Sequence, residues 1–254
     1  MITLKSERDL KIMRQACVIA ATVLDELCQM AREGISTWEI DRAAKEIMEK
    51  HSCRSASYKY KCGSLRYPGY ICVSVNDEII HGIGSPDRVL KSGDIVSMDV
   101  CVVYQGFVGD NTRTVVIGQA SPEVLRLVKT TEESMHVGIS KALAGNRVGD
   151  ISAAIQKCVE DAGYSVIREF TGHGVGKKLH EEPEVPNYGK AGTGALLRPG
   201  MTLAIEPMVA MGKPDIKIGP DGWTVYTLDG KPSSHSEHTI LITDSEPEIL
   251  TVRK

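Results

Sequence analysis

The sequence predicts an α+β fold in which an antiparallel sheet is covered by helices and built from two similar halves. Helix-turn-helix patterns followed by strand-like runs occur twice along the 254-residue chain. One pair of these runs is joined by a turn of about three residues, which requires antiparallel pairing. The chain length fits one large domain or two fused small ones.

The first half begins with two capped helices. Ser6, with an acid three residues later, can cap a helix over about 7–32 that Gly34 ends. Ser36-Thr-Trp-Glu39 is a capping box that begins a second helix, which runs to about Lys50. The apolar runs that follow predict strands at residues 70–75, 94–103 and 107–117.

The second half repeats this order. Ser121, followed by Pro122 at the first helical position, begins a helix to about Ala144. Another helix is predicted over 150–162, where Gly163 ends it. Strand-like runs follow at residues 165–170, 202–210 and 238–243.

An offset of 111 residues aligns the two helical segments. It places Gly34, Ile40, Ala43 and Glu49 on Gly145, Ile151, Ala154 and Glu160. Helical amphipathicity alone produces some such matches, so chance is the alternative to an internal duplication. A duplication would divide a single catalytic domain, 1–254, into halves of about 1–118 and 119–254. It would also place a site on the axis between the halves, with each half supplying ligands.

Composition and charge exclude several functional classes. A net charge of −3 provides no basic field for nucleic acid. The seven cysteines are odd in number and form no C-x-x-C pair, which indicates reduced thiols in a cytosolic setting. The sequence has neither an apolar signal region nor a stretch of about 18 apolar residues, so we expect a soluble, cytoplasmic protein without a membrane span.

Two acids of the first half stand in strand-like runs. Asp99 lies in the middle of the apolar run 94–103, where an unpaired carboxylate is costly. In a hairpin centred between residues 104 and 105, Asp110 would lie directly opposite Asp99. Such a pair requires a positive partner. The alternatives to a metal are that Arg113 neutralises one acid or that Asp110 belongs to a turn.

The second half adds similar residues. Glu206 is embedded in an apolar strand, Glu237 begins another, and His173 stands at the centre of the glycine-rich segment 172–176. Four carboxylates with one imidazole suit Mn²⁺, Fe²⁺, Co²⁺ or Zn²⁺ in octahedral-like sites rather than a tetrahedral Cys/His zinc site. Because carboxylates can bridge, five side chains can hold two metals about 3.5–4 Å apart.

The glycine-rich segment 172–176 matches neither the dinucleotide-binding fingerprint nor the P-loop. One interpretation of this segment is a glycine turn that only connects strands. His173 at its centre favours the other interpretation, in which the backbone lies close to a bound ligand. The sequence has no G-x-S-x-G, S-x-x-K or H-E-x-x-H motif, so serine-nucleophile and zincin chemistry lack their usual local signals.

Several further motifs occur in a fixed order. They are His81-Gly-Ile83, Gly93-Asp-Ile-Val-Ser-Met-Asp99, Gly109-Asp110, Gly172-His-Gly-Val-Gly176, His180-Glu-Glu-Pro183, Pro199-Gly-Met201, Ile205-Glu-Pro-Met208 and Ser236-Glu-His-Thr239. In order and spacing, across nearly the whole chain, these motifs resemble the pita-bread metallopeptidases, and specifically the type I, bacterial-type methionine aminopeptidases.

The resemblance implies a dinuclear metal site. Asp110 and Glu237 would bridge two divalent metals, Asp99 would complete one site, and His173 with Glu206 the other. Water activated by the metals would attack the first peptide bond of polypeptides that begin with methionine and a small second residue. Glu206 would move the proton of the nucleophile.

The resemblance also implies substrate-binding residues. His180 would stabilise the charge on the scissile carbonyl oxygen, and His81 would contact the peptide nitrogen. Tyr67, Cys72 and Trp223 would line the methionine pocket, where sulfur and aromatic contacts suit a thioether. Ordinary core packing is the alternative for Cys72 and Trp223.

The sequence departs from the family pattern at Ser64 and Leu179, where aromatic residues are common, and at Cys62, which is shifted by one position from the usual cysteine. These positions bear on pocket shape and on the preference for methionine. The resemblance further suggests a monovalent cation near Asn76 and Ser233, nascent polypeptides as substrates, a contact with the ribosome, and a monomer.

Two other functions are the alternatives to a methionine aminopeptidase. An X-Pro peptidase of the same fold usually carries an additional amino-terminal domain, for which this chain has no room. A non-catalytic pita-bread protein that binds nucleic acid or other proteins would show lost ligands or basic extensions, and neither is present.

Overall fold

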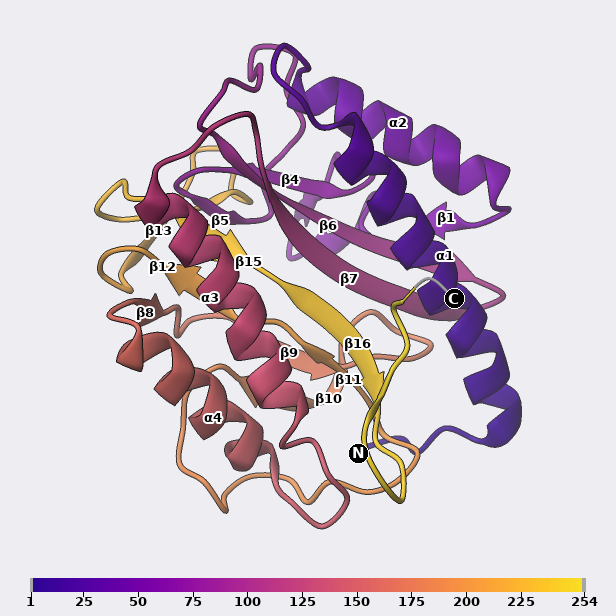
Figure 1. Ribbon diagram of the computed structural model, residues 1–254. Helices are drawn as coiled ribbons and strands as arrows, with labels where there is room; N and C mark the ends of the chain where they lie inside the picture. The colour runs from indigo at the N-terminus through magenta and orange to yellow at the C-terminus, as the bar shows by residue number, and fades with distance from the viewer. Residues whose placement is uncertain (1, 253–254) are drawn as a thin grey trace.

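The computed structural model describes residues 2–252, and four α-helices lie within this range (Figure 1). Their bounds are Glu7–Met30 (α1), Thr37–Lys50 (α2), Pro122–Ile139 (α3) and Val148–Asp161 (α4). The predicted caps are confirmed, because the side chains of Ser6, Ser36 and Ser121 each accept a hydrogen bond from the backbone three residues later. Helix α3 ends earlier than predicted, since the backbone after Ser140 bonds in short turns.

A nine-stranded antiparallel sheet forms the centre of the molecule. Its strands follow the order β1-β6-β7-β16-β11-β9-β10, with β4 paired to β6 and β17 to β16. Their bounds are Arg54–Ser55 (β1), Cys72–Val75 (β4), Ile95–Tyr104 (β6), Phe107–Val116 (β7), Thr171–Gly174 (β9), Glu181–Pro186 (β10), Thr202–Ile205 (β11), Glu237–Leu241 (β16) and Glu248–Ile249 (β17). The two halves of the chain therefore meet where β7 pairs with β16.

The remaining strands form three small sheets. They are Lys61–Cys62 (β2), Leu65–Arg66 (β3), Glu78–Ile80 (β5), Ser165–Val166 (β8), Met208–Ala210 (β12), Ile216–Ile218 (β13), Val225–Thr227 (β14) and Ser233–His235 (β15). The single strand predicted over 202–210 is wrong. It is broken at Glu206-Pro207, where proline has no N–H to donate, and its second part joins β8 and β15 instead.

The predicted register of the β6–β7 hairpin is also wrong. Tyr104 pairs with Phe107, and the turn consists of Gln105 and Gly106, both with positive φ, as a two-residue hairpin turn requires. Asp99 therefore lies opposite Thr112 rather than Asp110. The shift is two residues, so both aspartates still point to one face of the sheet.

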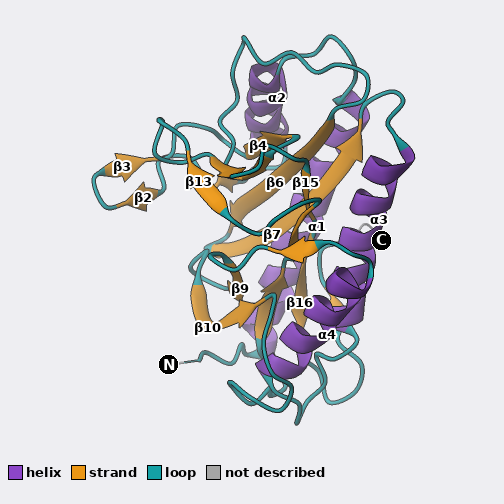
Figure 2. Cartoon of the chain, turned by 90° about the vertical axis from the view of Figure 1, so that its left-hand side faces the viewer, coloured by secondary structure: helices purple, strands orange, loops and turns teal. Residues whose placement is uncertain are grey.

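The helices pack on the sheet and leave room for a site on its other side. Helix α1 packs against β6 and β7, whereas α3 packs against α4 and β15, and α4 packs against β10. Figure 2 shows the β2–β3 hairpin standing out on the side away from α3 and α4. The largest hydrophobic clusters lie one in each half, around Leu24 and Met98 and around Leu127 and Leu203. None of the described helices is long and apolar enough to cross a membrane.

The 111-residue offset relates matching local structures. Helices α2 and α4 both have 14 residues, and each begins 111 residues from the other. Gly34 and Gly145 both have φ near +90° and donate to Leu90 and Leu197 respectively. The two halves thus share this helix-turn-helix in detail. That they arose by duplication and form a single catalytic domain stays a prediction.

Candidate metal centre

All ten site residues predicted from the sequence line one cavity of about 330 Å³. They are Tyr67, Cys72, His81, Asp99, Asp110, His173, His180, Glu206, Trp223 and Glu237. The acidic residues and His173 come from five neighbouring strands or strand ends, so the central sheet forms the floor of the cavity.

Strand register explains how three of the acids meet. Thr112 on β7 lies opposite Asp99 on β6 and opposite Glu237 on β16. Asp110 is two residues from Thr112 and therefore points to the same face. The ligand oxygens of Asp110 and Glu237 lie within 4.8 Å of a ring nitrogen of His173 and of each other.

The other edge of the site follows the same rule. His173 on β9 pairs with Ala204 on β11, and Glu206 follows two residues later on the same face. The Nε2 atom of His173 is 3.3 Å from Oε1 of Glu206 and 3.8 Å from Oδ2 of Asp110. Both halves of the chain therefore contribute to the cluster.

The carboxylates crowd one another in a poorly solvated space. Asp110 and Glu237 are each only 3% exposed. Burial, followed by the charge of Asp99, raises the pKa of Asp110 and of Glu206 well above the usual range. Burial and the charge of Asp110 do the same to the pKa of Glu237. Arg113 neutralises none of them, because its guanidinium bonds Asp25 at 2.7 Å on another surface.

His173 is a neutral imidazole with a free lone pair on Nε2. Burial and the nearby His180 lower the pKa of His173 to about 3. Its Nδ1 lies 2.9 Å from the carbonyl oxygen of Gly174, which only an Nδ1–H group can satisfy. The lone pair of Nε2 therefore faces the acids, as in a metal-binding imidazole.

Two buried polar atoms at the site lack partners. Among the described residues, Oε1 of Glu237 and Nε2 of His235 have no hydrogen bond, although the other oxygen of Glu237 accepts from Thr112 at 2.9 Å. Buried polar atoms normally find partners. Clustered carboxylates, a neutral imidazole and an unpartnered oxygen together fit divalent cations.

Three further histidines surround the acids. His81 has φ +58° and a pKa lowered to about 4, first by burial and then by His235 and His180. Burial lowers the pKa of His235 to about 4. The Nδ1 atom of His180 is 2.7 Å from the hydroxyl of Tyr60, and desolvation lowers the pKa of His180. All three therefore face the cavity as neutral imidazoles near pH 7.

An aromatic wall closes one side of the cavity. Tyr67 and Trp223 meet edge to face with ring centroids 5.3 Å apart. The hydroxyl of Tyr67 donates to the carbonyl oxygen of Gly82 at 2.6 Å, beside His81. Cys72, on the same side, is 5% exposed. This wall is apolar apart from the sulfur.

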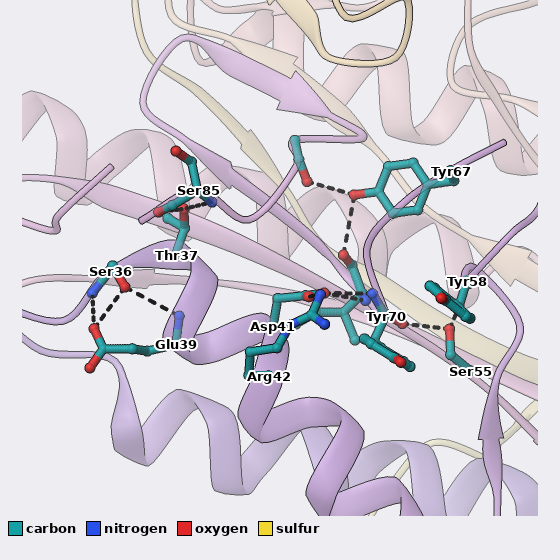
Figure 3. A network of polar contacts seen from close by, with 12 residues as sticks. Ser36, Thr37, Glu39, Asp41, Arg42, Ser55, Tyr58, Tyr67, Tyr70 and Ser85 are labelled. Atoms are coloured by element: carbon teal, nitrogen blue, oxygen red, sulfur yellow. Dashed lines mark hydrogen bonds and ion pairs between the residues drawn. The ribbon is translucent and has the colours of Figure 1, made fainter. Parts of the chain in front are cut away.

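A polar network fixes the segment that carries Tyr67 (Figure 3). The buried carboxylate of Asp41 on α2 accepts hydrogen bonds from the backbone N–H groups of Tyr70 and Ile71. Ser55 donates to the carbonyl oxygen of Tyr70 at 2.6 Å. Helix α2 thereby anchors the aromatic wall from behind.

Among the residues that line the cavity, sequence reasoning missed Tyr60, Cys101, Phe170 and His235, together with Ser57, Ile80 and Thr171. The i, i+2 spacing from Asp99 could have indicated Cys101. Tyr60 reaches His180 only through the fold. Of the three departures from the family pattern, Cys62 and Leu179 line the cavity and Ser64 lies in the exposed β2–β3 turn.

Asn76 and Ser233 lie in contact, away from the acids. The carbonyl oxygen of Asn76 accepts hydrogen bonds from the backbone and the hydroxyl of Ser233, at 2.8 and 3.3 Å. The amide oxygen of Asn76 accepts from Ile95. The structure thus places the two residues together, and the monovalent cation stays a prediction.

Comparisons with known proteins agree with this geometry. The model of metallopeptidase family M24 matches residues 11–244. A methionine aminopeptidase of Clostridium perfringens is 48% identical over 255 residues, covering 100% of both chains.

Solved structures extend the likeness to the fold. The crystal structure of a methionine aminopeptidase from Thermotoga maritima matches with a TM-score of 0.95 and 42% identity, covering 100% of both chains. A prolidase from Pyrococcus horikoshii matches with a TM-score of 0.77 at 23% identity, over 99% of this chain and 64% of its own, which shows the shared fold alone. The expected pita-bread fold is thus confirmed, and the chain belongs to metallopeptidase family M24.

Proposed function

We propose that the chain is a methionyl aminopeptidase, which hydrolyses the first peptide bond of polypeptides that begin with methionine and a small second residue. The observation that carries the proposal is the convergence of four carboxylates and a neutral imidazole beside an apolar pocket. Full-length relatives named methionine aminopeptidase support the substrate class.

Five residues would hold two divalent cations: Asp99, Asp110, His173, Glu206 and Glu237. Asp110 belongs to both groups of ligand atoms that could hold an ion, and Glu237 shares the second of them with His173. Oxygen donors with one imidazole suit Mn²⁺, Fe²⁺, Co²⁺ or Zn²⁺. When bound, the cations would lower the pKa of a water molecule and polarise the scissile carbonyl.

Glu206 is the residue best placed to move the proton of the nucleophile. Its carboxylate lies 3.3 Å from Nε2 of His173 and 3.5 Å from Nε2 of His235, at the edge of the acidic cluster. Burial, followed by the charge of Asp99, raises its pKa, so a proton is held at this carboxyl group more readily than at an exposed one. A carboxylate with a tunable pKa suits general acid–base work.

His180 and His81 would contact the peptide bond itself. The hydroxyl of Tyr60 lies 2.7 Å from Nδ1 of His180, and if it donates there His180 would carry its proton on Nε2. That proton would then be available to the carbonyl oxygen on which negative charge develops. His81, neutral on the opposite side, would contact the peptide nitrogen.

The methionine side chain would lie against Tyr67, Cys72 and Trp223. An edge-to-face aromatic pair beside a buried sulfur provides soft, apolar contacts for a thioether. The network around Asp41 keeps this wall in place, so the pocket is preformed.

We further infer that the protein acts in the cytoplasm on nascent polypeptides, as a monomer near the ribosome. Its seven cysteines are all free, and its net charge of −3 gives no general affinity for nucleic acid. We also retain a monovalent cation at Asn76 and Ser233 as part of the proposal.

A panel of peptides tests the function directly. Full-length protein loaded with Mn²⁺ or Co²⁺ should release methionine from Met-Ala peptides and leave X-Pro peptides intact. Glu206→Gln should retain metal and lose turnover. Preferential cleavage of X-Pro peptides would overturn the substrate assignment, and failure to bind any divalent cation would overturn the mechanism.

A further inference from the structure

Cys101 brings a thiol into the acidic cluster. Its Sγ atom lies 3.0 Å from Oδ1 of Asp110 and 3.3 Å from Oδ1 of Asp99. The donor atoms of these three residues all lie within 4.8 Å of one another, and Cys101 is 4% exposed. The thiol therefore lies beside the two aspartate oxygens as a third possible ligand atom.

Backbone register requires this position. Cys101 follows Asp99 by two residues on β6 and pairs directly with Asp110 on β7. All three side chains consequently point to the same face of the sheet. The backbone register thus places the thiol on the face of the sheet that carries the two aspartates.

A second observation points independently to a cation beside the thiol. Oε1 of Glu237 has no hydrogen-bond partner although the residue is only 3% exposed. Glu237 belongs to a second candidate group with Asp110 and His173, so the two groups share Asp110. Cys101 thus flanks the shared carboxylate on the side of Asp99.

The spacing fits adjacent ligands of one ion. A metal–sulfur bond of about 2.3 Å and a metal–oxygen bond of about 2.1 Å, at right angles, separate sulfur and oxygen by about 3.1 Å. The separations of 3.0 and 3.3 Å between Cys101 and the two aspartates agree with this geometry.

We propose that Cys101 is a thiolate ligand of the cation held by Asp99 and Asp110, an inference that rests on the proposed metal centre. The thiol proton would pass to solvent when the cation binds, because only a thiolate coordinates. A soft sulfur donor favours Zn²⁺, Fe²⁺ or Co²⁺ over Mn²⁺ or Mg²⁺ at this position. The ion preference of the Asp99 site would therefore differ from that of an all-oxygen and imidazole site.

Absorption spectra of the Co²⁺-loaded full chain test the proposal. Wild-type protein should show a sulfur-to-cobalt charge-transfer band in the near ultraviolet, and Cys101→Ser should lose it. Cys72→Ser is the matched control, since Cys72 is a second buried thiol opposite Asp99 and should leave the band unchanged. A band that survives Cys101→Ser, or that only Cys72→Ser removes, would overturn the assignment.

Ion competition gives a second readout. In wild-type protein Zn²⁺ should displace Mn²⁺ readily, and Cys101→Ser should lower the ratio of Zn²⁺ to Mn²⁺ affinity by about tenfold or more. If the thiol only donates hydrogen bonds to the aspartates, the substitution would weaken both ions alike and the ratio would not change.

X-ray absorption on the Zn²⁺-loaded wild-type protein needs no variant. A sulfur shell at about 2.3 Å is expected beside the nitrogen and oxygen shells. Two bound ions and active enzyme without that shell would overturn the role of Cys101 and leave the proposed function standing. If no divalent ion binds at all, both proposals fail.

Discussion

Glu237→Gln is expected to stabilise the metal-free protein while it abolishes tight metal binding. The ligand oxygens of Glu237 and Asp110 lie within 4.8 Å of each other in a buried cluster. At an effective dielectric constant of about 20, two ionised carboxylates at this distance repel by about 3.5 kcal/mol. The cluster relieves part of this repulsion by binding protons, so we expect a net gain of about 1–3 kcal/mol near pH 8.

The gain should depend on pH with a definite sign. Burial and the charge of Asp110 raise the pKa of Glu237 in the folded chain, so the folded state holds protons that the unfolded state has released. The contribution of this proton binding to the free energy of unfolding is fully present below the unfolded pKa of about 4.3. It is lost as pH rises through the raised pKa of the folded state. His173 and His235 are neutral in the folded chain near pH 7, because their pKa values are lowered to about 3 and about 4. The advantage of Glu237→Gln should therefore grow as pH rises above about 4.3, where the unfolded chain releases the proton that the folded cluster keeps.

Thermal melting of chelator-treated protein measures this effect. A gain of 1 kcal/mol corresponds to about 2–4 °C in Tm for a chain of this size. Glu132→Gln, at an exposed position of α3, is the matched control and should change stability by less than about 0.5 kcal/mol. Calorimetric titration with Co²⁺ should show that tight binding is lost in Glu237→Gln. A metal-free variant that melts below wild type at every pH would refute the electrostatic account of the cluster.

Three further substitutions test other parts of the site. Tyr60→Phe removes the hydrogen-bond partner of His180 Nδ1 and should lower kcat by about tenfold with little change in metal content. Steady-state kinetics and metal analysis measure the two quantities. An unchanged kcat would contradict a role of Tyr60 in positioning His180. Asp41→Ala leaves two backbone N–H groups unpaired and should lower the free energy of unfolding in denaturant by about 2–4 kcal/mol. It should also raise KM, because Tyr67 is held less firmly. A variant as stable as the wild type would contradict the role of the network. Gly109→Ala would place a methyl group 2.4 Å from the carbonyl oxygen of Ala16 on α1. It should lower the free energy of unfolding by about 1–3 kcal/mol, measured by denaturant unfolding. An unchanged free energy of unfolding would mean that α1 moves freely.

Local signals determined the helices. Capping residues such as Ser36 and Ser121 act within four positions of the chain, so their effect is visible in the sequence. The helix ends and strand ends were less certain. The break at Pro207 and the early end of α3 depend on which neighbours take up the backbone hydrogen bonds, and those neighbours are set by the fold.

The candidate ligands were accessible to sequence reasoning because a carboxylate in an apolar strand is costly and thus conspicuous. Asp99, Asp110, Glu206 and Glu237 all belong to this class, and the family motifs add His173, His81 and His180. The pairing of Asp99 with Asp110 was nevertheless predicted in the wrong register, since the two-residue turn at Gln105-Gly106 sets the hairpin. A shift of two residues preserves the face of the sheet, so both aspartates still line the same cavity.

The sequence by itself determined the fold class, the family resemblance and the acids that gather at one site. Only the tertiary structure decided that Tyr60 reaches His180, that Cys101 lies between two aspartates, and that Asp41 anchors the wall behind Tyr67. Each of these contacts joins residues whose proximity is set by strand register or by the packing of α2, rather than by their own neighbours in the chain. Local chemistry therefore marks which residues are costly to bury, and long-range packing decides which of them meet.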